Sequence, residues 1–227
     1  MAVVLAIGPH PDDIEIAMGG AICLLHAQGH EVVVCDLTDG EPTPIGSPER
    51  RAAETGEASR LLGVRRRMTL GLPNRFLQDT IEARLQVAEV IRKVRPDVLF
   101  VPYWVDAHPD HVAACALAEA ARFTAKLTRT SMQGEPHYPD RVFHFFSTHY
   151  RLHVKPSFIV DISDHIEAKM ASVAAYTSQF GGERGNAEIL DTIRETCAYW
   201  GRLIHRRYGE AFVCREEIGI ARWDGLI

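Results

Sequence analysis

The stretch AVVLAIGPHPDDIE, residues 2–15, joins an apolar run directly to a cluster of ionisable side chains. Residues 2–7 are aliphatic throughout, and residues 31–38 (EVVVCDLT) begin with a second run of this kind. Strands that are apolar on both faces are typical of a buried parallel sheet. His10, Asp12 and Asp13 follow the first run at once, with Pro11 between them. The stretch therefore predicts a buried strand whose carboxyl end carries polar groups.

Predicted strands and helices alternate along the rest of the chain. We expect strands at 2–7, 31–38, 68–72, 97–103, 141–146, 157–162 and 211–216, and helices at 18–28, 49–62, 80–94, 109–126, 164–180 and 187–207. This alternation indicates an α/β fold, a Rossmann-like three-layer sandwich with helices on both faces of a mostly parallel sheet. The expected strand order is 3-2-1-4-5. Without a repeat or a break in composition, residues 1–227 are predicted to form a single domain.

Composition and charge exclude several classes of protein. The formal net charge of −5 argues against a nucleic-acid partner, which needs a dense basic face, and the RRR cluster at 65–67 is expected to be a solvated turn. No apolar run is long enough to span a bilayer, so no membrane partner is expected. The N-terminus lacks the features of a signal peptide. Five dispersed cysteines without a C-x-x-C pair indicate reduced thiols and predict a cytoplasmic protein.

A second polar motif, DAHPDH at 106–111, follows the strand predicted at 97–103. In an open α/β sheet, ligands bind beyond the carboxyl ends of the strands, where the strand order reverses. The order 3-2-1-4-5 makes the first and fourth strands neighbours at that point. We therefore expect the two His-Pro-Asp motifs to face each other across one crevice.

Histidine and aspartate in this pairing point to a metal site. Imidazole nitrogens and carboxylate oxygens are ligands of zinc, and three protein ligands leave a position for water. The alternative is plain helix-start chemistry, because Asp caps helices and Pro suits the first turn. Two such motifs at equivalent positions favour the metal. No partner at ligand spacing is found for His137, His144, His149, His153 and His205. Gly19-Gly20 is expected to let the first helix pack closely against the sheet.

The motifs resemble those of the LmbE/PIG-L superfamily of zinc-dependent N-acetylglucosaminyl deacetylases. The family signature (A/P)-H-P-D-D-x-E is present at 9–15, and H-P-D-H is present at 108–111. Further similar segments are CDLTDGE at 35–41, ERRAAE at 49–54, LGLPNR at 70–75 and AYTSQF at 175–180. These segments are most similar to a small bacterial branch that includes the N-acetylglucosaminyl-malate deacetylase of bacillithiol synthesis.

The resemblance implies a role for individual residues. Three of them would be ligands of one zinc ion per chain, with Fe²⁺ or another divalent metal as alternatives: His10, Asp13 and His111. Asp12 would be the general base. His108 would stabilise the oxyanion or protonate the leaving amine, with Asp110 orienting its imidazole. Arg51 would contact the substrate, and Glu15 would hold the loop.

The implied reaction removes the N-acetyl group from an N-acetylglucosamine-type substrate such as the malate glycoside, giving acetate and a free amino sugar. An acidic substrate would favour a basic pocket, to which Arg51 and Arg75 are candidate contributors, whereas Arg184 is expected to be a solvated surface residue rather than a third contributor. Whether loop 128–140 or segment 181–190 lines this pocket stays open. The resemblance also implies a homo-oligomer, a trimer or hexamer. Two alternatives are a non-enzymatic nucleotide or sugar-nucleotide binding module and a metal-dependent phosphoesterase, which would want two metals.

Overall fold

One seven-stranded sheet organises the computed structural model, which describes residues 1–182, 186 and 188–219. The strands, in the order in which they lie in the sheet, are β3 (Arg66–Thr69), β2 (Glu31–Asp36), β1 (Val3–Gly8), β4 (Val98–Pro102), β5 (Arg141–Phe145), β7 (Gly209–Val213) and β6 (Phe158–Asp161). The first five are parallel, which confirms the predicted order 3-2-1-4-5. The sequence did not indicate that β7 lies antiparallel between β5 and β6.

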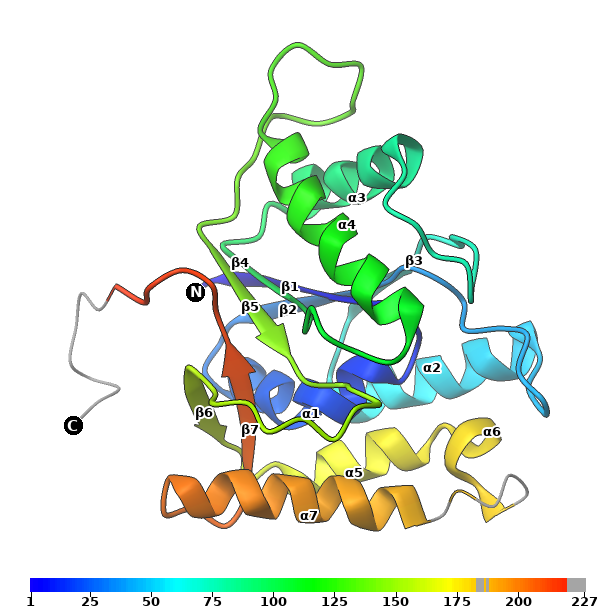
Figure 1. Ribbon diagram of the computed structural model, residues 1–227, viewed down its shortest axis with the longest axis vertical. Coiled ribbons are helices and arrows are strands. Elements are labelled where there is room, and N and C mark those ends of the chain that lie inside the picture. The colour runs from blue at the N-terminus through cyan, green and yellow to red at the C-terminus, as the bar shows by residue number, and fades with distance from the viewer. Residues whose placement is uncertain (183–185, 187, 220–227) are drawn as a thin grey trace.

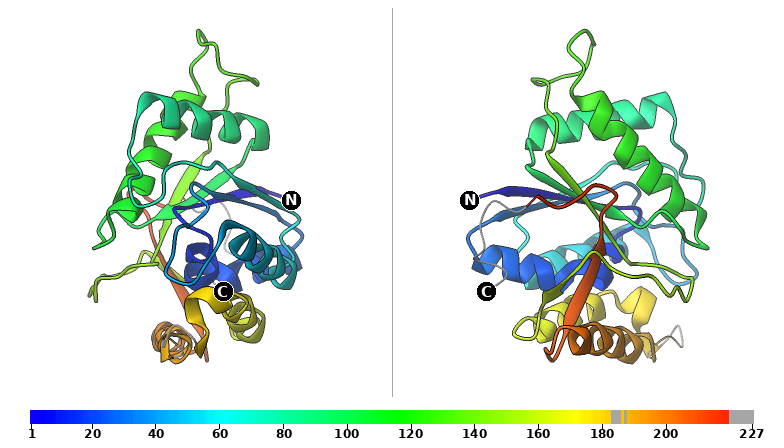
Figure 2. Two further views of the ribbon diagram at one scale, coloured as in Figure 1. Left: turned by 90° about the vertical axis from the view of Figure 1, so that its right-hand side faces the viewer. Right: turned by 60° about the vertical axis from the view of Figure 1, so that its left-hand side comes forward.

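Helices cover both faces of the sheet, as Figure 1 and the turned views in Figure 2 show. They are α1 (Asp13–Ala27), α2 (Pro48–Leu62), α3 (Ile81–Val94), α4 (Pro109–Ala125), α5 (Ile166–Ala174), α6 (Thr177–Phe180) and α7 (Glu188–Leu203). Leu5 and Ile7 of β1 pack on the side of α3 and α4, whereas Val4 and Ala6 pack with α1. This alternation is the two-residue period of a strand buried on both faces.

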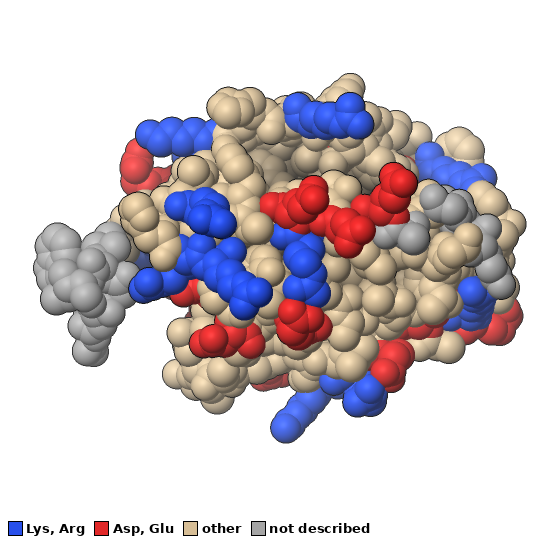
Figure 3. Space-filling view, turned by 90° about the horizontal axis from the view of Figure 1, so that it is seen from below, with Lys and Arg blue, Asp and Glu red and all other residues tan. Residues whose placement is uncertain are grey.

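The helices α5, α6 and α7 form a further layer beyond α1 and α2 (Figure 1). Their apolar side chains form a separate cluster that also includes Ala58 of α2. On the face of the molecule seen in Figure 3, acidic and basic side chains are interspersed. The ion pairs Arg194–Glu167 and Arg206–Asp161 belong to this layer and to the neighbouring β6 strand.

Three local predictions were wrong. The first helix begins at Asp13 rather than near residue 18, and it is interrupted at Met18, where φ is −143°. The helix predicted at 164–180 is two helices, α5 and α6, separated at the buried Tyr176. The RRR cluster is not a solvated turn, because Arg66 begins β3 and the Arg67 side chain is largely buried.

The loop predicted at 128–140 lies at the far end of α3 and α4, at the top of Figure 1. The guanidinium group of Arg92 in α3 holds this region by donating to four backbone carbonyl groups, those of Ala125, Leu127, Met132 and Gly134. All five cysteines are free thiols. Among the described residues, no helix is both long and apolar enough to cross a lipid bilayer.

Candidate metal centre and active site

The two His-Pro-Asp motifs meet at the carboxyl ends of the neighbouring strands β1 and β4, as predicted. The first lies between β1 and α1, and the second lies between β4 and α4. His10 Nε2 lies 3.1 Å from Asp110 Oδ2, so a direct hydrogen bond joins the motifs across the crevice. Residues a hundred positions apart therefore share one buried cluster.

The three residues expected to bind a metal are in contact around one point. Asp13 Oδ2 lies 3.1 Å from His10 Nδ1, and Asp13 Oδ1 lies 3.4 Å from His111 Nε2. One ligand atom from each residue lies within 4.8 Å of the other two, and all three residues are buried. Two imidazoles and a carboxylate in this arrangement fit the donor set of a divalent transition metal.

The outer nitrogen of each imidazole is held by a further carboxylate. Asp110 Oδ2 contacts His10 Nε2, and Asp106 Oδ2 lies 2.8 Å from His111 Nδ1. Such partners fix the ring orientation and leave the inner nitrogen free to bind a metal. Asp106 belongs to the DAHPDH motif, but no role was predicted for it from the sequence. Its position five residues before His111 was the available signal.

The contacts of Asp110 differ from the expectation that its carboxylate orients the His108 imidazole. Its carboxylate accepts from the backbone N–H groups of Arg75 and Leu77 at 2.6 and 3.1 Å, in addition to its bond with His10. The hydrogen bond between Asp110 and His108 uses the backbone N–H of Asp110, which donates to His108 Nδ1 at 3.2 Å. The carboxylate therefore orients His10, and it anchors the loop that precedes α3.

The electrostatics of the cluster are those of a site built to hold positive charge. Burial opposes protonation of His10, but its hydrogen bonds with Asp110 and Asp13 raise the pKa of His10 to about 10. Burial likewise opposes ionisation of Asp13, but His111 and His10 lower the pKa of Asp13. The carboxylates outweigh desolvation, so a cation is favoured at this position.

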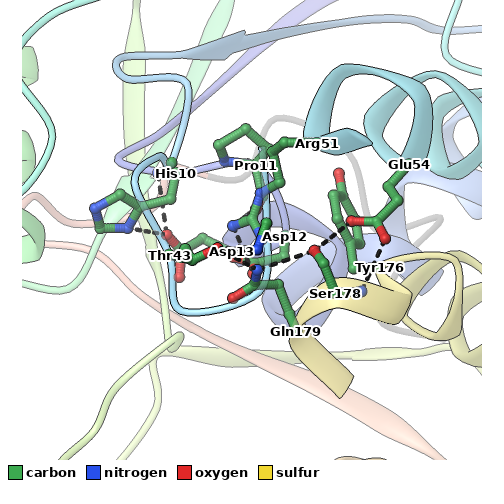
Figure 4. Close-up of polar contacts among 12 residues, drawn as sticks. His10, Pro11, Asp12, Asp13, Thr43, Arg51, Glu54, Tyr176, Ser178 and Gln179 are labelled. Atoms are coloured by element: carbon green, nitrogen blue, oxygen red, sulfur yellow. Dashed lines mark hydrogen bonds and ion pairs between the residues drawn. The ribbon is translucent and has the colours of Figure 1, made fainter. Parts of the chain in front are cut away.

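Asp12 occupies a strained turn that Arg51 braces. Its backbone has a φ of 117°, a conformation that residues other than glycine rarely adopt. Arg51 Nη2 donates to the Pro11 carbonyl at 2.7 Å and to Asp12 Oδ2 at 3.0 Å, as Figure 4 shows. Burial raises the pKa of Asp12 to about 7, although Arg51 acts in the opposite direction. Asp12 and Asp13 are thus adjacent residues with opposite pKa shifts.

Arg51 retains unused hydrogen-bonding capacity. Its Nε and Nη1 atoms are buried without a hydrogen-bond partner in the part of the chain that the structure describes. The guanidinium group lies 5.3 Å from the centre of the Tyr176 ring. Buried donors of this kind ordinarily find an acceptor. A ligand oxygen at this position would supply one.

His108 lies beside the triad and has a different protonation preference. Its ring stacks on that of His111, with 4.8 Å between the centroids, and burial together with the neighbouring His10 and His111 lowers the pKa of His108 to about 4. Since Nδ1 accepts the Asp110 N–H, the proton of the neutral ring is on Nε2. The ring of His149 lies 5.1 Å from that of His111. Asp106, His111 and His149 offer ligand atoms within 4.8 Å of one another, so the prediction that His149 has no partner at ligand spacing was wrong.

A buried ionic network holds Glu15, the last residue of the first motif. Arg67 bonds both carboxylate oxygens of Asp36, and its Nη1 lies 2.5 Å from Glu15 Oε1. The Tyr176 hydroxyl donates to the same Glu15 oxygen at 3.0 Å. Glu15, which was expected to hold the loop, thus connects α1 to β3 and to the residue before α6. The role of Arg67 was missed in the sequence because the arginine run looked solvated.

The polar cluster opens into a cavity of about 740 Å³. Its wall includes His10, Asp12, Asp13, His108, His111, His149, Arg51, Arg75, Arg151, Phe146, Tyr150 and Trp200. None of residues 128–140 lines it, whereas Asn186 and Ile189 of segment 181–190 do. Arg75 is therefore at the cavity as expected, and Arg184 lies outside the described residues.

Comparisons with known proteins agree with this geometry. A family model described as PIG-L, GlcNAc-PI de-N-acetylase, matches residues 5–122. The diacetylchitobiose deacetylase of Thermococcus kodakarensis is 35% identical over 223 residues, covering 91% of this chain and 80% of its own.

Two solved structures are also similar to the chain. The conserved protein TT1542 from Thermus thermophilus superimposes with a TM-score of 0.90 and 38% identity, covering 98% of this chain and 99% of its own. The N,N'-diacetylchitobiose deacetylase from Pyrococcus horikoshii has a TM-score of 0.81 and 31% identity, with 93% and 82% of the two chains covered.

Proposed function

The chain belongs to the PIG-L family of deacetylases, and from this premise we propose that it removes the N-acetyl group from an N-acetylglucosamine glycoside. The observation that carries the proposal is the buried triad of His10, Asp13 and His111, with Asp12 beside it at a large cavity. Membership of a deacetylase family sets aside the nucleotide-binding module. The products would be acetate and a free amino sugar.

The triad would hold one divalent cation, with Zn²⁺ as the first candidate. When bound, such an ion lowers the pKa of a water molecule and polarises the acetamide carbonyl. Asp12 is the group we assign to accept the proton of the attacking water. Arg51 supports this role because its bond to Asp12 Oδ2 fixes the direction of the carboxylate.

His108 is assigned to the developing negative charge on the acetamide oxygen. Its low pKa keeps the ring neutral at pH 7, and the Nδ1 atom is already an acceptor. The Nε2–H group is therefore the one that donates to the oxyanion, an interaction that strengthens as charge develops. A neutral imidazole is a poor acid, so we assign protonation of the leaving amine to Asp12.

The cavity favours a substrate larger than one sugar ring. A volume of about 740 Å³ is in the range of pockets that hold drug-sized ligands. Arg51, Arg75 and Arg151 on its wall favour an acidic aglycone such as malate. Diacetylchitobiose is the second candidate, supported by the relative that is 35% identical. We further propose one domain over residues 1–227, a cytoplasmic location and a homo-oligomeric assembly.

An acetate-release screen tests the proposal. The purified protein, loaded with Zn²⁺ or Fe²⁺, is offered N-acetylglucosamine, its malate glycoside, its inositol glycoside and diacetylchitobiose. We expect release from at least one glycoside, fastest from the malate compound, and one metal ion per chain by elemental analysis. Release from none of them would contradict the activity. Two ions per chain with hydrolysis of a phosphate ester would favour the phosphoesterase instead.

A further inference from the structure

Helix α1 is interrupted one turn after it begins, and side chains from elsewhere occupy the interruption. Met18 has φ −143° and ψ 19°, so the turn that starts at Asp13 is offset from the rest of the helix. In an unbroken helix, the Gly20 N–H would donate to the Ile16 carbonyl. Here the Gly20 and Ala21 N–H groups donate to Glu210 Oε1 and Oε2, at 3.0 and 2.7 Å.

The carbonyl groups on the other side of the interruption bind a lysine. Lys169 Nζ donates to the carbonyls of Glu15 and Ile16 at 3.2 and 2.5 Å, and it lies 2.6 Å from Glu210 Oε1. A cation at the end of the first turn and an anion at the start of the next segment both match the helix dipole. One ion pair therefore replaces backbone hydrogen bonds on both sides of Met18.

This ion pair is buried, and both of its residues also belong to the wall of the cavity. Lys169 comes from α5 and is 0% exposed, while Glu210 comes from β7 and is 2% exposed. Gly19 makes room for the lysine, because a Cβ there would lie 3.2 Å from Lys169 Cγ, and Gly20 makes room for Ile162, which would lie 2.7 Å from a Cβ at that position. The expectation for Gly19-Gly20 therefore needs correction: these glycines allow approach by Lys169 and Ile162.

A buried ion pair is weak evidence for stability, because an apolar pair of similar volume is often as stable or more so. The contacts of this pair are instead specific to the ends of the interrupted helix. The turn that they terminate carries Asp13 at its first residue and Glu15 at its third. The position of the Asp13 carboxylate relative to His10 and His111 therefore depends on how this turn is fixed.

We propose that Lys169 and Glu210 are positioning residues for the metal centre. The pair holds the first turn of α1 at the angle that brings Asp13 between the two histidines. This role rests on the metal site of the proposed function. It places determinants of that site in α5 and β7, outside both His-Pro-Asp motifs.

The test is the cobalt affinity of a double variant, Lys169→Met with Glu210→Gln, which removes both charges together. Neither side chain is thereby left as an uncompensated buried charge, which single variants would create. The matched control is Glu167→Gln with Arg194→Met, because this exposed ion pair also starts from α5 but joins it to the neighbouring α7. Circular dichroism and thermal unfolding establish that each variant is folded.

We expect the double variant to bind Co²⁺ 10–100-fold more weakly, the range typical of lost outer-shell support, with an altered visible absorption band. The control should retain both wild-type properties. A folded double variant with wild-type Co²⁺ affinity and spectrum would overturn the proposal. If it does not fold, Glu210→Asp carries the same measurement, because it keeps the charges but shortens the reach to Gly20 and Ala21.

Failure of the positioning role and failure of the metal site give different results. A wild-type protein that binds no Co²⁺ would contradict the metal site on which the proposal rests. A wild-type protein that binds Co²⁺ but releases no acetate would contradict the deacetylase activity alone. In that case the effect of Lys169 and Glu210 on cobalt affinity would still be measurable.

Discussion

The two His-Pro-Asp motifs contain the same three residue types but are stabilised in different ways. At the start of α4, His108 is extended with φ −81°, its side chain caps the helix, and α4 continues unbroken to Ala125. At the start of α1, Asp12 has φ 117°, makes no side-chain cap, and the helix is interrupted at Met18. The backbone of the second motif is stabilised by this local cap, and its Asp110 carboxylate also accepts from the backbone N–H groups of Arg75 and Leu77. The first depends on Arg51, Lys169 and Glu210 from other elements.

This difference shows what a catalytic turn requires beyond its own sequence. Proline at the first helical position and a capping side chain are sufficient for an ordinary helix start. A left-handed aspartate costs energy and persists only when surrounding groups hold it. The more strained of the two motifs is also the one that contains the adjacent aspartates of the proposed site.

The largest expected effect separates those aspartates. Asp13→Ala should lose the metal and with it all turnover, because it removes a ligand between two imidazoles. Asp12→Ala should retain the metal but lose about 10²–10⁴-fold in kcat, the usual contribution of a general base. Asp12→Asn is the matched control, since asparagine tolerates positive φ. Elemental analysis of the desalted variants checks this; equal metal in both alanine variants would contradict the assigned roles.

A smaller effect is expected at the second motif, where the His108 side chain caps α4 and is also assigned as a donor to the oxyanion. His108→Ala should cost about 1 kcal/mol of stability through loss of the helix cap. His108→Asn should keep the cap, because asparagine is a good N-cap residue. Both should lose about 10²–10³-fold in kcat if the ring donates to the oxyanion. Denaturant unfolding and steady-state kinetics measure the two effects separately, and full activity of His108→Asn would rule out the donor role.

The smallest effect is expected at Glu54, which lies in α2, the helix that also carries Arg51. Burial opposes ionisation of Glu54, but hydrogen bonds from Ser178, Thr177 and Arg50 lower its pKa below the ordinary value of 4.5. Its contribution to stability is therefore complete above pH 4.5 and is lost as the pH falls through the lowered pKa.

We expect Glu54→Gln to lower Tm at pH 6 by a few degrees, about 2–4 °C for each kcal/mol lost, and the difference from wild type to shrink below pH 4.5. Thermal unfolding between pH 6 and pH 3 measures this. The control variant is Glu57→Gln, because the ion pair of Glu57 with Arg60 is exposed. Its Tm should change little at any pH. A constant difference at every pH would show that the charge of Glu54 is unimportant.

The parallel half of the fold could be predicted because its signals are local. Apolar runs identified β1, β2 and β4, and the two motifs marked the ends of β1 and β4. The position of β7 could not be predicted in this way. A short strand carries no local sign of which neighbours it will pair with, and the residues of β7 pair antiparallel with residues 67 to 69 positions earlier in β5 and 48 to 54 positions earlier in β6.

The candidate site was predictable where residues lie next to each other in the sequence. His10, Asp13 and His111 came from motifs, whereas Arg67 and His149 reach the site through tertiary structure alone. Arg67 has the sequence context of a surface arginine, and only the tertiary structure places it between the carboxylates of Glu15 and Asp36. The break in α1 was hidden for the same reason, because its partners Lys169 and Glu210 are more than 150 residues away.

The place of β7 also constrains the order in which the molecule can be completed. During synthesis, β5 lacks its neighbour β7 until residues 209–213 have left the ribosome, and the bond from Gly20 to Glu210 spans 190 residues. Contacts of such separation form late, because a long loop must close first. The nascent chain would therefore carry both His-Pro-Asp motifs while the 99 residues from 112 to 210 are added, before the interruption in α1 acquires its ion pair. If Lys169 and Glu210 position Asp13 as proposed, the proposed metal site is completed only once β7 has joined the sheet.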